Sequence, residues 1–165
     1  MQKLTLGLAL AGCVAASQSA ALSCMRPDVA QSFRMAAASE DVYIVLLGQF
    51  NFAPLPSTQT DDINAPREVS GPATFTGQYL GAEGFQDAPM FDMTIAVTCA
   101  GPWCGGIAPS DDSYLAFVQQ TADGYVLAVD PCGTSAFANP TPEQIATVES
   151  CMNGDPCEPS NAPLP

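Results

Sequence analysis

The sequence predicts a mainly β fold: a five-stranded OB-like barrel with an N-terminal and a C-terminal helix, braced by disulfides. Three observations favour this class. Short segments in which apolar residues run together or alternate with polar ones recur between clusters of turn residues, as is typical of β-strands. An amphipathic helical pattern precedes these segments and another follows them. The cysteines form an even set once the N-terminal segment is set aside.

The N-terminus predicts export from the cytosol. Lys3 precedes an uncharged run over residues 4–16, which is too short to span a bilayer as a permanent helix. Small residues follow and allow cleavage before Leu22 or before Cys24. We therefore expect residues 1–23 to be a signal peptide and the mature chain to be periplasmic or extracellular, in a bacterial cell envelope. A buried N-terminal helix is the alternative.

A second route of processing would attach the chain to a membrane. The segment Leu10-Ala11-Gly12-Cys13 resembles a bacterial lipobox, in which the cysteine is lipidated and becomes the first residue. The apolar core before this segment is short for a lipoprotein signal. Cys13 is thus a candidate lipidation site, and a membrane is expected as a partner only through it.

The cysteines support export. There are seven, and removing or lipidating Cys13 leaves six, which predicts three disulfides in an oxidising compartment. A zinc site is the alternative interpretation. It is disfavoured because no two cysteines stand as close as Cys-x-x-Cys and the chain has no histidine. The six expected disulfide cysteines are Cys24, Cys99, Cys104, Cys132, Cys151 and Cys157.

The charge excludes one class of partner. The chain has 4 Lys and Arg against 17 Asp and Glu, a net charge of −13. Such a surface repels phosphate backbones, so we expect no nucleic-acid binding, and anionic lipid surfaces are disfavoured for the same reason. High acidity favours solubility and is compatible with a salty habitat, where salt screens the repulsion between like charges.

Both helices are predicted by apolar spacing and by capping residues. Asp28 suits the positive end of a helix dipole, and apolar residues then recur on one helical face as far as Ser39. Towards the C-terminus, Thr141 and Gln144 form a capping box around a proline at the first helical position. This second helix should run to about Cys151.

Five strands are predicted between the helices. Residues 42–47 are apolar almost without interruption, which indicates a strand buried on both faces, and Gly48 marks a bend near its end. The clearest alternation lies in residues 90–99, where the apolar side chains share one face. The other three strands are expected at residues 73–80, 113–119 and 125–130, with an Asp-Gly hairpin turn between the last two.

Two segments are expected to lack regular structure. Residues 51–71 are rich in Pro, Asp, Asn, Ser and Thr and predict a long loop. Residues 153–165 form a proline-rich C-terminal tail, which a disulfide at Cys157 could hold. The mature chain is short enough for one domain, which we place at residues 24–152.

The order of these landmarks resembles the netrin-like domains, an OB-type barrel family that includes the tissue inhibitors of metalloproteinases. The shared features are a cysteine just after the signal, a strand after the first helix, a Cys-Gly…Tyr-Leu segment, a cysteine after the next hairpin, and a last helix ending in cysteine. In this chain they are Cys24, residues 40–48, Cys104-Gly105 with Tyr114-Leu115, Gly124 with Cys132, and residues 141–151. The resemblance covers most of the mature chain.

The chain also departs from that family. The family often has a second cysteine two residues after the first, where this chain has Arg26. It often has another near the end of the first helix, whereas none lies between Cys24 and Cys99 here. Cys99 and Cys157 are additional. The disulfides of this chain are therefore expected to be partly rewired relative to the family.

The resemblance implies a disulfide pairing and an activity. It implies a Cys24–Cys104 bond, and proximity along the proposed fold then predicts Cys99–Cys132 and Cys151–Cys157. In the inhibitor branch, a free N-terminal cysteine presents its amine and carbonyl to the zinc of a metalloprotease. A cut before Cys24 would create this feature, although the paired cysteine of the branch is missing.

Little catalytic chemistry is available to this chain. Without histidine, the usual Ser-His and Cys-His pairs are excluded, and the single lysine leaves with the signal. There is no phosphate-binding or dinucleotide motif. Pairs of acids could serve a glycosidase or bind calcium, but adjacent acids on loops are more often solvated. The glycosidase candidates are Glu40-Asp41, Asp61-Asp62 and Asp111-Asp112, and the calcium candidates are Asp61-Asp62 with Asn64, and Asp111-Asp112. We expect no catalytic residue, no metal site and no cofactor.

The single tryptophan permits two interpretations. Trp103 could pack over the neighbouring disulfide and close one end of the barrel, or it could be an exposed anchor for a partner. Cys24, Met25 and Trp103 are the candidate partner-contact residues. The expected function is an exported, non-enzymatic binding or envelope-associated module, monomeric, acting on a protein or small-molecule ligand. The alternatives are a lipoprotein through Cys13, a metalloprotease inhibitor through Cys24, and a carboxylate-based hydrolase.

Overall fold

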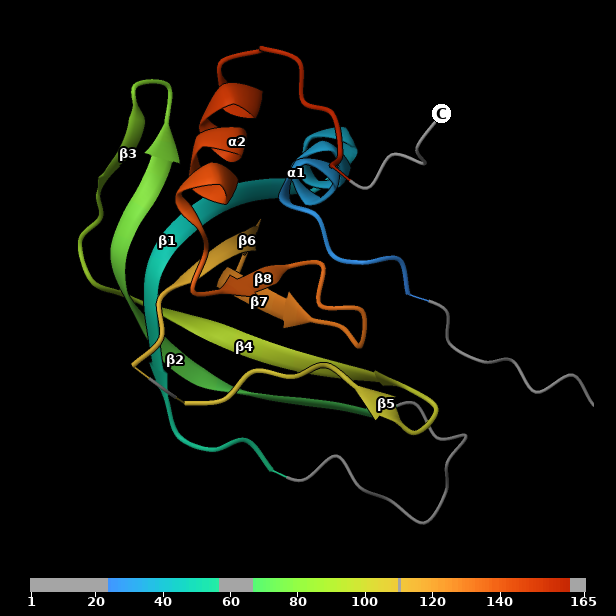
Figure 1. Cartoon of the computed structure of the whole chain (residues 1–165). Coiled ribbons are helices and arrows are strands. Elements are labelled where there is room, and N and C mark those ends of the chain that lie inside the picture. Colours follow the sequence, from blue (N-terminus) through green and yellow to red (C-terminus); the bar gives the residue numbers. More distant parts are fainter. Residues whose placement is uncertain (1–23, 57–66, 110, 161–165) are drawn as a thin grey trace, which may run out of the picture.

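The structure is a computed structural model that describes residues 24–56, 67–109 and 111–160 (Figure 1). The predicted signal peptide and the candidate lipidation site Cys13 lie outside these residues, as does the Asp61-Asp62 pair. In chain order the elements are α1 (Val29–Ala38), β1 (Val42–Phe52), β2 (Arg67–Gly81), β3 (Gly84–Asp87), β4 (Phe91–Ala100), β5 (Trp103–Cys104), β6 (Tyr114–Thr121), β7 (Gly124–Val129), β8 (Ala136–Ala138) and α2 (Pro142–Met152).

Five strands close into a barrel, which confirms the predicted fold class. β1 pairs with β2 and β6, β2 with β4, β4 with β7, and β7 with β6. The β4–β7 pair is parallel and the other four are antiparallel. The long strands bend, so that one strand pairs with different neighbours along its length. β1 pairs with β6 over Val42–Gly48 and with β2 over Leu46–Phe52. Closure pairs strand edges that would otherwise be open.

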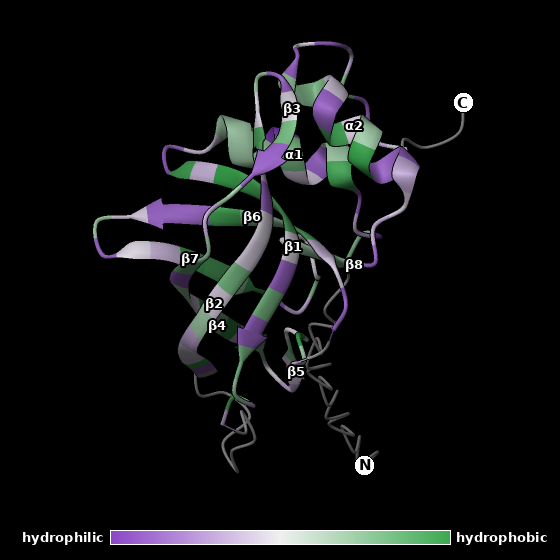
Figure 2. Cartoon of the chain, turned by 90° about the vertical axis from the view of Figure 1, so that its left-hand side faces the viewer, coloured by the Kyte–Doolittle hydropathy of each residue, from purple (hydrophilic) through white to green (hydrophobic). Residues whose placement is uncertain are grey.

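The interior of the barrel is apolar. Phe75, Leu46 and Ile95 are fully buried in it, and Figure 2 shows apolar and polar residues alternating in the last part of β1, over residues 49–52. The predicted one-faced pattern of β4 is confirmed, since Met93, Ile95 and Val97 are buried. The prediction that residues 42–47 are buried on both faces is wrong at the start of β1. There the side chains of Val42 and Tyr43 are both exposed, and full burial begins only at Val45.

Both helices lie on the same side of the barrel (Figure 1). A second apolar cluster joins them to the outer face of the strands, with Val29 from α1, Val148 from α2, and Leu115 and Phe117 from β6. The predicted capping box of α2 is confirmed. The Thr141 backbone N–H donates to the Gln144 side chain at 2.9 Å, and the Gln144 N–H donates back to the Thr141 hydroxyl at 3.3 Å.

The start of α1 also holds the C-terminal tail. Asp28 caps the helix by accepting from the Gln31 N–H at 3.0 Å. Its other carboxylate oxygen accepts from the backbone N–H of Ser160 at 3.0 Å and from the Ser160 hydroxyl. Burial of Asp28 raises the pKa of its carboxyl, but these hydrogen bonds outweigh burial and leave the pKa below its usual value. The charged form of Asp28 therefore ties the two ends of the domain together.

All six described cysteines form disulfides, with one of the three predicted pairings confirmed. The bonds are Cys24–Cys132, Cys99–Cys104 and Cys151–Cys157. The predicted Cys24–Cys104 and Cys99–Cys132 bonds are wrong. Cys99 and Cys104 bond to each other because they are direct partners in the β4–β5 hairpin, where their Cα atoms lie 3.9 Å apart. Cys132 follows β7, beside the segment that leads into α1, and its Cα lies 5.3 Å from that of Cys24.

The three disulfides fit an oxidising, non-cytoplasmic environment. Across residues 24–56, 67–109 and 111–160, none of the helices has the length and apolar character needed to cross a membrane.

Candidate functional site

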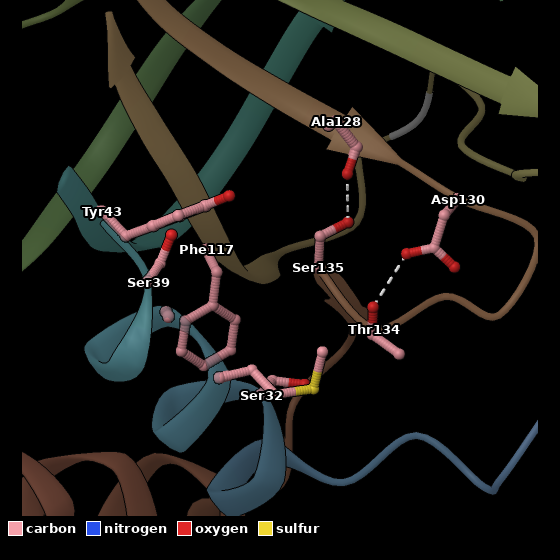
Figure 3. Close-up of a pocket in the computed structure, with 10 residues that line it drawn as sticks. Ser32, Ser39, Tyr43, Phe117, Ala128, Asp130, Thr134 and Ser135 are labelled. Carbon is pink, nitrogen blue, oxygen red and sulfur yellow. Dashed lines mark hydrogen bonds between the residues drawn. The ribbon is translucent and has the colours of Figure 1, made fainter. Parts of the chain in front are cut away.

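A pocket of about 320 Å³ opens between α1, the start of β1 and the segment that joins β7 to β8 (Figure 3). Its floor is apolar. Phe117 of β6 and Ala128 of β7 come from the barrel, and Met35 and Ala36 come from α1. The Phe117 ring is fixed by edge-on contact with Phe137, at a centroid distance of 6.3 Å. The floor therefore belongs to the packed barrel and helix rather than to a free loop.

The segment between β7 and β8 forms one polar wall. Asp130 folds it by accepting from the Cys132 N–H at 2.6 Å and from the Thr134 hydroxyl at 2.8 Å. The Ser135 hydroxyl donates to the Ala128 carbonyl, as Figure 3 shows. Gly133 allows the turn with φ of +64°, and its N–H donates to the Asp130 carbonyl. Because of these bonds, three oxygen-bearing side chains face the pocket in a fixed arrangement.

The opposite wall comes from α1 and the start of β1. Ser39 accepts from the Asp41 N–H at 3.1 Å, and Tyr43 is 37% exposed beside it. Figure 3 places Ser39 and Tyr43 on one side of the pocket and Asp130, Thr134 and Ser135 on the other. The mouth of the pocket is therefore bordered by one aromatic ring and several hydroxyl groups.

Ser32 is the least expected residue in this lining. It is 5% exposed, and its hydroxyl forms no hydrogen bond with any residue of the described ranges. Buried hydroxyl groups are nearly always hydrogen-bonded, to protein, water or ligand. The hydroxyl of Ser32 is thus a polar group in the most buried part of the lining, within reach of water or of any molecule that enters the pocket.

The pocket lies in a negative part of the molecule. Among the described lining residues, Asp130 carries the one charged side chain. Glu40 and Asp41 are exposed between Ser39 and Tyr43, close to the mouth along the chain. Arg34, on α1, is directed instead toward Glu158 of the tail, at 3.7 Å.

The structure does not bring the described acid pairs into a shared site. Within the described ranges, no group of three or more His, Cys, Asp or Glu residues could hold a metal ion. The Asp111 carbonyl accepts from the Gln49 side chain, and the Asp112 carboxylate accepts from Asn139. Asp61, Asp62 and Asn64 lie outside the described residues.

The candidate partner-contact residues are exposed, at a different place from the pocket floor. Met25 is 68% exposed, beside Cys24. Trp103 is 51% exposed on β5, so about half of its surface is available to a partner. A Cβ atom built on Gly105 would lie 2.1 Å from the Val129 carbonyl oxygen, which shows how closely this hairpin rests on the end of β7.

The polar residues of the pocket were not among the candidate residues predicted from the sequence. These are Ser32, Tyr43, Asp130, Thr134 and Ser135. One signal was present: Asp130 begins an Asp-Pro-Cys-Gly-Thr run, which is typical of a turn folded by an aspartate side chain. The other residues carry no distinctive motif, and only the fold brings them together.

Comparison of this chain with family models, with curated proteins and with solved structures found no match.

Proposed function

We propose that this chain is an exported, non-enzymatic binding module of the cell envelope, and that the pocket beside α1 is its ligand site. The observation that carries the proposal is the pocket itself. It has a rigid apolar floor, fixed oxygen atoms on both walls, and the buried hydroxyl of Ser32 without a partner among the described residues. Small-molecule sites generally combine an apolar lining with a few fixed polar groups in this way.

Export is supported by the cysteine pairs and by the N-terminal sequence. A domain with three disulfides is suited to a periplasmic or extracellular compartment. The charged start and apolar run of residues 1–23 have the pattern of a secretory signal. Membership of the netrin-like family stays part of the proposal, supported by the order of the strands and the positions of the helices.

Intact-mass measurement tests the export part of the proposal. The protein expressed with its own N-terminus should be recovered from the periplasm or medium, beginning at Leu22 or Cys24. Reduction should add the mass of one hydrogen for each of the six bonded cysteines. A mass beginning at Cys13 with acyl chains would support the lipoprotein instead. A full-length, reduced, cytosolic protein would contradict export altogether.

Backbone-amide NMR tests the binding part. Titration of the mature, oxidised protein with neutral, cationic and anionic fragments should shift amides of α1 and of residues 130–135. Ala36→Leu, which fills the floor of the pocket, should remove these shifts. Ala37→Leu, on the exposed side of the same helix, is the matched control and should preserve them. If fragments of all three kinds leave the wild-type spectrum unchanged, the pocket is not a ligand site.

Metalloprotease inhibition is a second candidate because of the position of Cys24. This cysteine is exposed and tied to Cys132, so a chain that begins there would have its α-amine held at the surface. Protein starting at Cys24 should be titrated against several metalloproteases, with a Met-extended chain as the control that blocks the amine. Equal activity of the proteases with both proteins, or no inhibition by either, would remove this candidate.

A further inference from the structure

We propose that the pocket beside α1 binds a small organic cation, a protonated primary amine on an apolar body. This inference rests on the proposed function of the pocket and adds the chemical class of its ligand. It comes from one juxtaposition: the Asp130 carboxylate lies beside the hydroxyl groups of Thr134 and Ser135, and both hydroxyl hydrogens are already donated within the protein.

The hydrogen bonds of the β7–β8 segment determine what that wall can offer. The Thr134 hydroxyl gives its hydrogen to Asp130, and the Ser135 hydroxyl gives its hydrogen to the Ala128 carbonyl. Each hydroxyl oxygen keeps lone pairs but has no further hydrogen to donate. The carboxylate of Asp130 can only accept, and two lone-pair sites remain on it after the bonds from Cys132 and Thr134.

The wall therefore presents acceptors and no side-chain donor. A primary ammonium group carries three N–H donors and no acceptor, so it matches this wall. Against this wall a carboxylate or phosphate ligand would place its oxygens against oxygens, so its only donors would be the hydroxyl groups of Ser32, Ser39 and Tyr43 elsewhere in the described lining. A neutral polyol could donate to the wall, but its hydroxyl groups would gain less from Asp130 than an ammonium group, whose bond joins two opposite charges.

The surrounding charge favours the same class. No lysine or arginine is among the described residues that line the pocket, and Glu40 and Asp41 lie near its mouth along the chain. The whole chain carries a net charge of −13, which raises the local concentration of cations and lowers that of anions.

The floor limits the size and nature of the rest of the ligand. Phe117, Ala128 and Ala36 offer an apolar surface that suits a short alkyl or aryl body, and the Tyr43 ring stands at the mouth. The volume, about 320 Å³, is at the lower end of the range for small-molecule sites. A ligand of a few carbon atoms with one ammonium group fits these limits.

Three probes of matched size separate the classes of ligand. Mature, oxidised, ¹⁵N-labelled protein is titrated at constant ionic strength with n-butylammonium, 1-butanol and butyrate. Butylammonium should shift amides in α1 and residues 130–135, and it should bind at least about tenfold more tightly than butanol, as expected for a charge-assisted hydrogen bond. Butyrate should cause no shifts in these residues.

Variants connect the binding to the wall. Ser135→Ala removes one acceptor and should weaken butylammonium binding several-fold and butanol binding by a smaller factor, because butanol has one hydrogen to donate and an ammonium group has three. Asp130→Asn should reduce the preference for the cation. Since Asp130 also folds the turn, Ala36→Leu gives an independent test: it should abolish the shifts, and the exposed Ala37→Leu should not.

The outcomes distinguish this inference from the proposed function. If butanol or butyrate binds in the pocket as tightly as butylammonium, the proposed preference for a cation is contradicted, whereas the proposal that the pocket is a ligand site is supported. If butylammonium shifts survive Ala36→Leu, the cation binds elsewhere and the inference fails. If none of the probes or fragments binds, both the ligand class and the pocket's function are contradicted.

Discussion

Gly48 of β1 and Gly77 of β2 face each other in register, and neither position has room for a side chain. A Cβ atom on Gly48 would lie 2.3 Å from the Thr76 carbonyl oxygen. A Cβ atom on Gly77 would lie 2.3 Å from the Leu47 carbonyl oxygen, and the φ of +155° there disfavours other residues as well. The pair lets β1 and β2 approach closely where β1 passes from one neighbour to the other.

Gly48→Ala should therefore destabilise the barrel by about 2 kcal/mol or more, because the added methyl group meets backbone that cannot move aside. Urea unfolding of the oxidised protein, followed by circular dichroism, measures the change. Gly106→Ala is the control, since a Cβ atom there has no neighbour within 4 Å. Its effect should stay within about 0.5 kcal/mol. Equal effects of the two substitutions would contradict the close approach of the strands.

The disulfides should contribute unequally to stability. Cys24–Cys132 spans a sequence separation of 108, and Cys99–Cys104 spans 5. By loop entropy, the paired substitution Cys24→Ala with Cys132→Ala should cost about 4 to 5 kcal/mol, and the Cys99→Ala with Cys104→Ala pair about 2 kcal/mol. Urea unfolding of both double variants gives the comparison. A larger loss in the hairpin variant would count against this order.

Peptide mapping checks the pairing directly. Non-reducing proteolysis followed by mass spectrometry should yield a peptide that links Cys24 to Cys132, and another that contains Cys151 and Cys157. Cys99 and Cys104 should be found bonded within one short peptide. A peptide that links Cys24 to Cys104 would restore the pairing that the family resemblance implies.

Asp28 should make the stability of the domain depend on pH. Burial raises the pKa of its carboxyl, but the hydrogen bonds from Ser160 and Gln31 outweigh burial, so the folded-state pKa lies below the usual value. A lowered folded-state pKa contributes stability above the unfolded pKa, about 3.9, and this stability is lost as pH falls through the folded-state pKa.

Asp28→Asn should accordingly lower the free energy of unfolding by about 1 kcal/mol at pH 7, as expected for a lost cap, and by less near pH 3. Urea unfolding at the two pH values measures this difference. Asp41→Asn, at an exposed position, is the control and should show little change at either pH. A deficit for Asp28→Asn that grows toward pH 3 would contradict a lowered folded-state pKa.

Ser32→Ala should leave the free energy of unfolding unchanged or raise it by about 1 kcal/mol, because a buried hydroxyl without a partner among the described residues is lost. Ser135→Ala should instead lower it by about 1 kcal/mol, since its hydrogen bond to Ala128 is broken. Thermal unfolding of the ligand-free protein compares the two variants. Destabilisation by Ser32→Ala as large as that by Ser135→Ala would mean that the Ser32 hydroxyl has a partner.

Trp103 gives a simple optical test of the barrel end. It is the single tryptophan and is 51% exposed, so native fluorescence should be red-shifted and readily quenched by acrylamide. Unfolding should change the emission maximum little. A blue-shifted native emission that resists quenching would show instead that the ring is enclosed.

The parts of the fold that depend on local patterns could be predicted from the sequence. Met93, Ile95 and Val97 alternate with polar residues, and the strand follows directly from this spacing. Thr141 and Gln144 define the start of α2 through a capping box that needs no distant partner. The prediction of a loop over residues 51–71 is wrong at both ends. β1 extends to Phe52 and β2 begins at Arg67, since the first part of β2 pairs with β4.

Features that depend on register could not be predicted. Cys99 and Cys104 bond because a two-residue strand, β5, folds back on β4, and so short a strand has no recognisable period. The pocket has the same origin. Ser32, Tyr43 and Asp130 belong to three separate segments, and nothing in their local sequence shows that barrel closure brings them together.

The disulfide between Cys24 and Cys132 is nested around the one between Cys99 and Cys104. During synthesis Cys24 emerges first, and Cys99 and Cys104 both appear before its true partner. Oxidation in order of appearance would therefore join Cys24 to Cys99 and leave Cys104 for Cys132. The native bond requires that the chain first bring the end of β7 beside the segment leading into α1. Formation of the Cys24–Cys132 bond thus shows that the last barrel strand, β7, is in place. A disulfide isomerase would act on the non-native bonds from Cys24 to Cys99 and from Cys104 to Cys132.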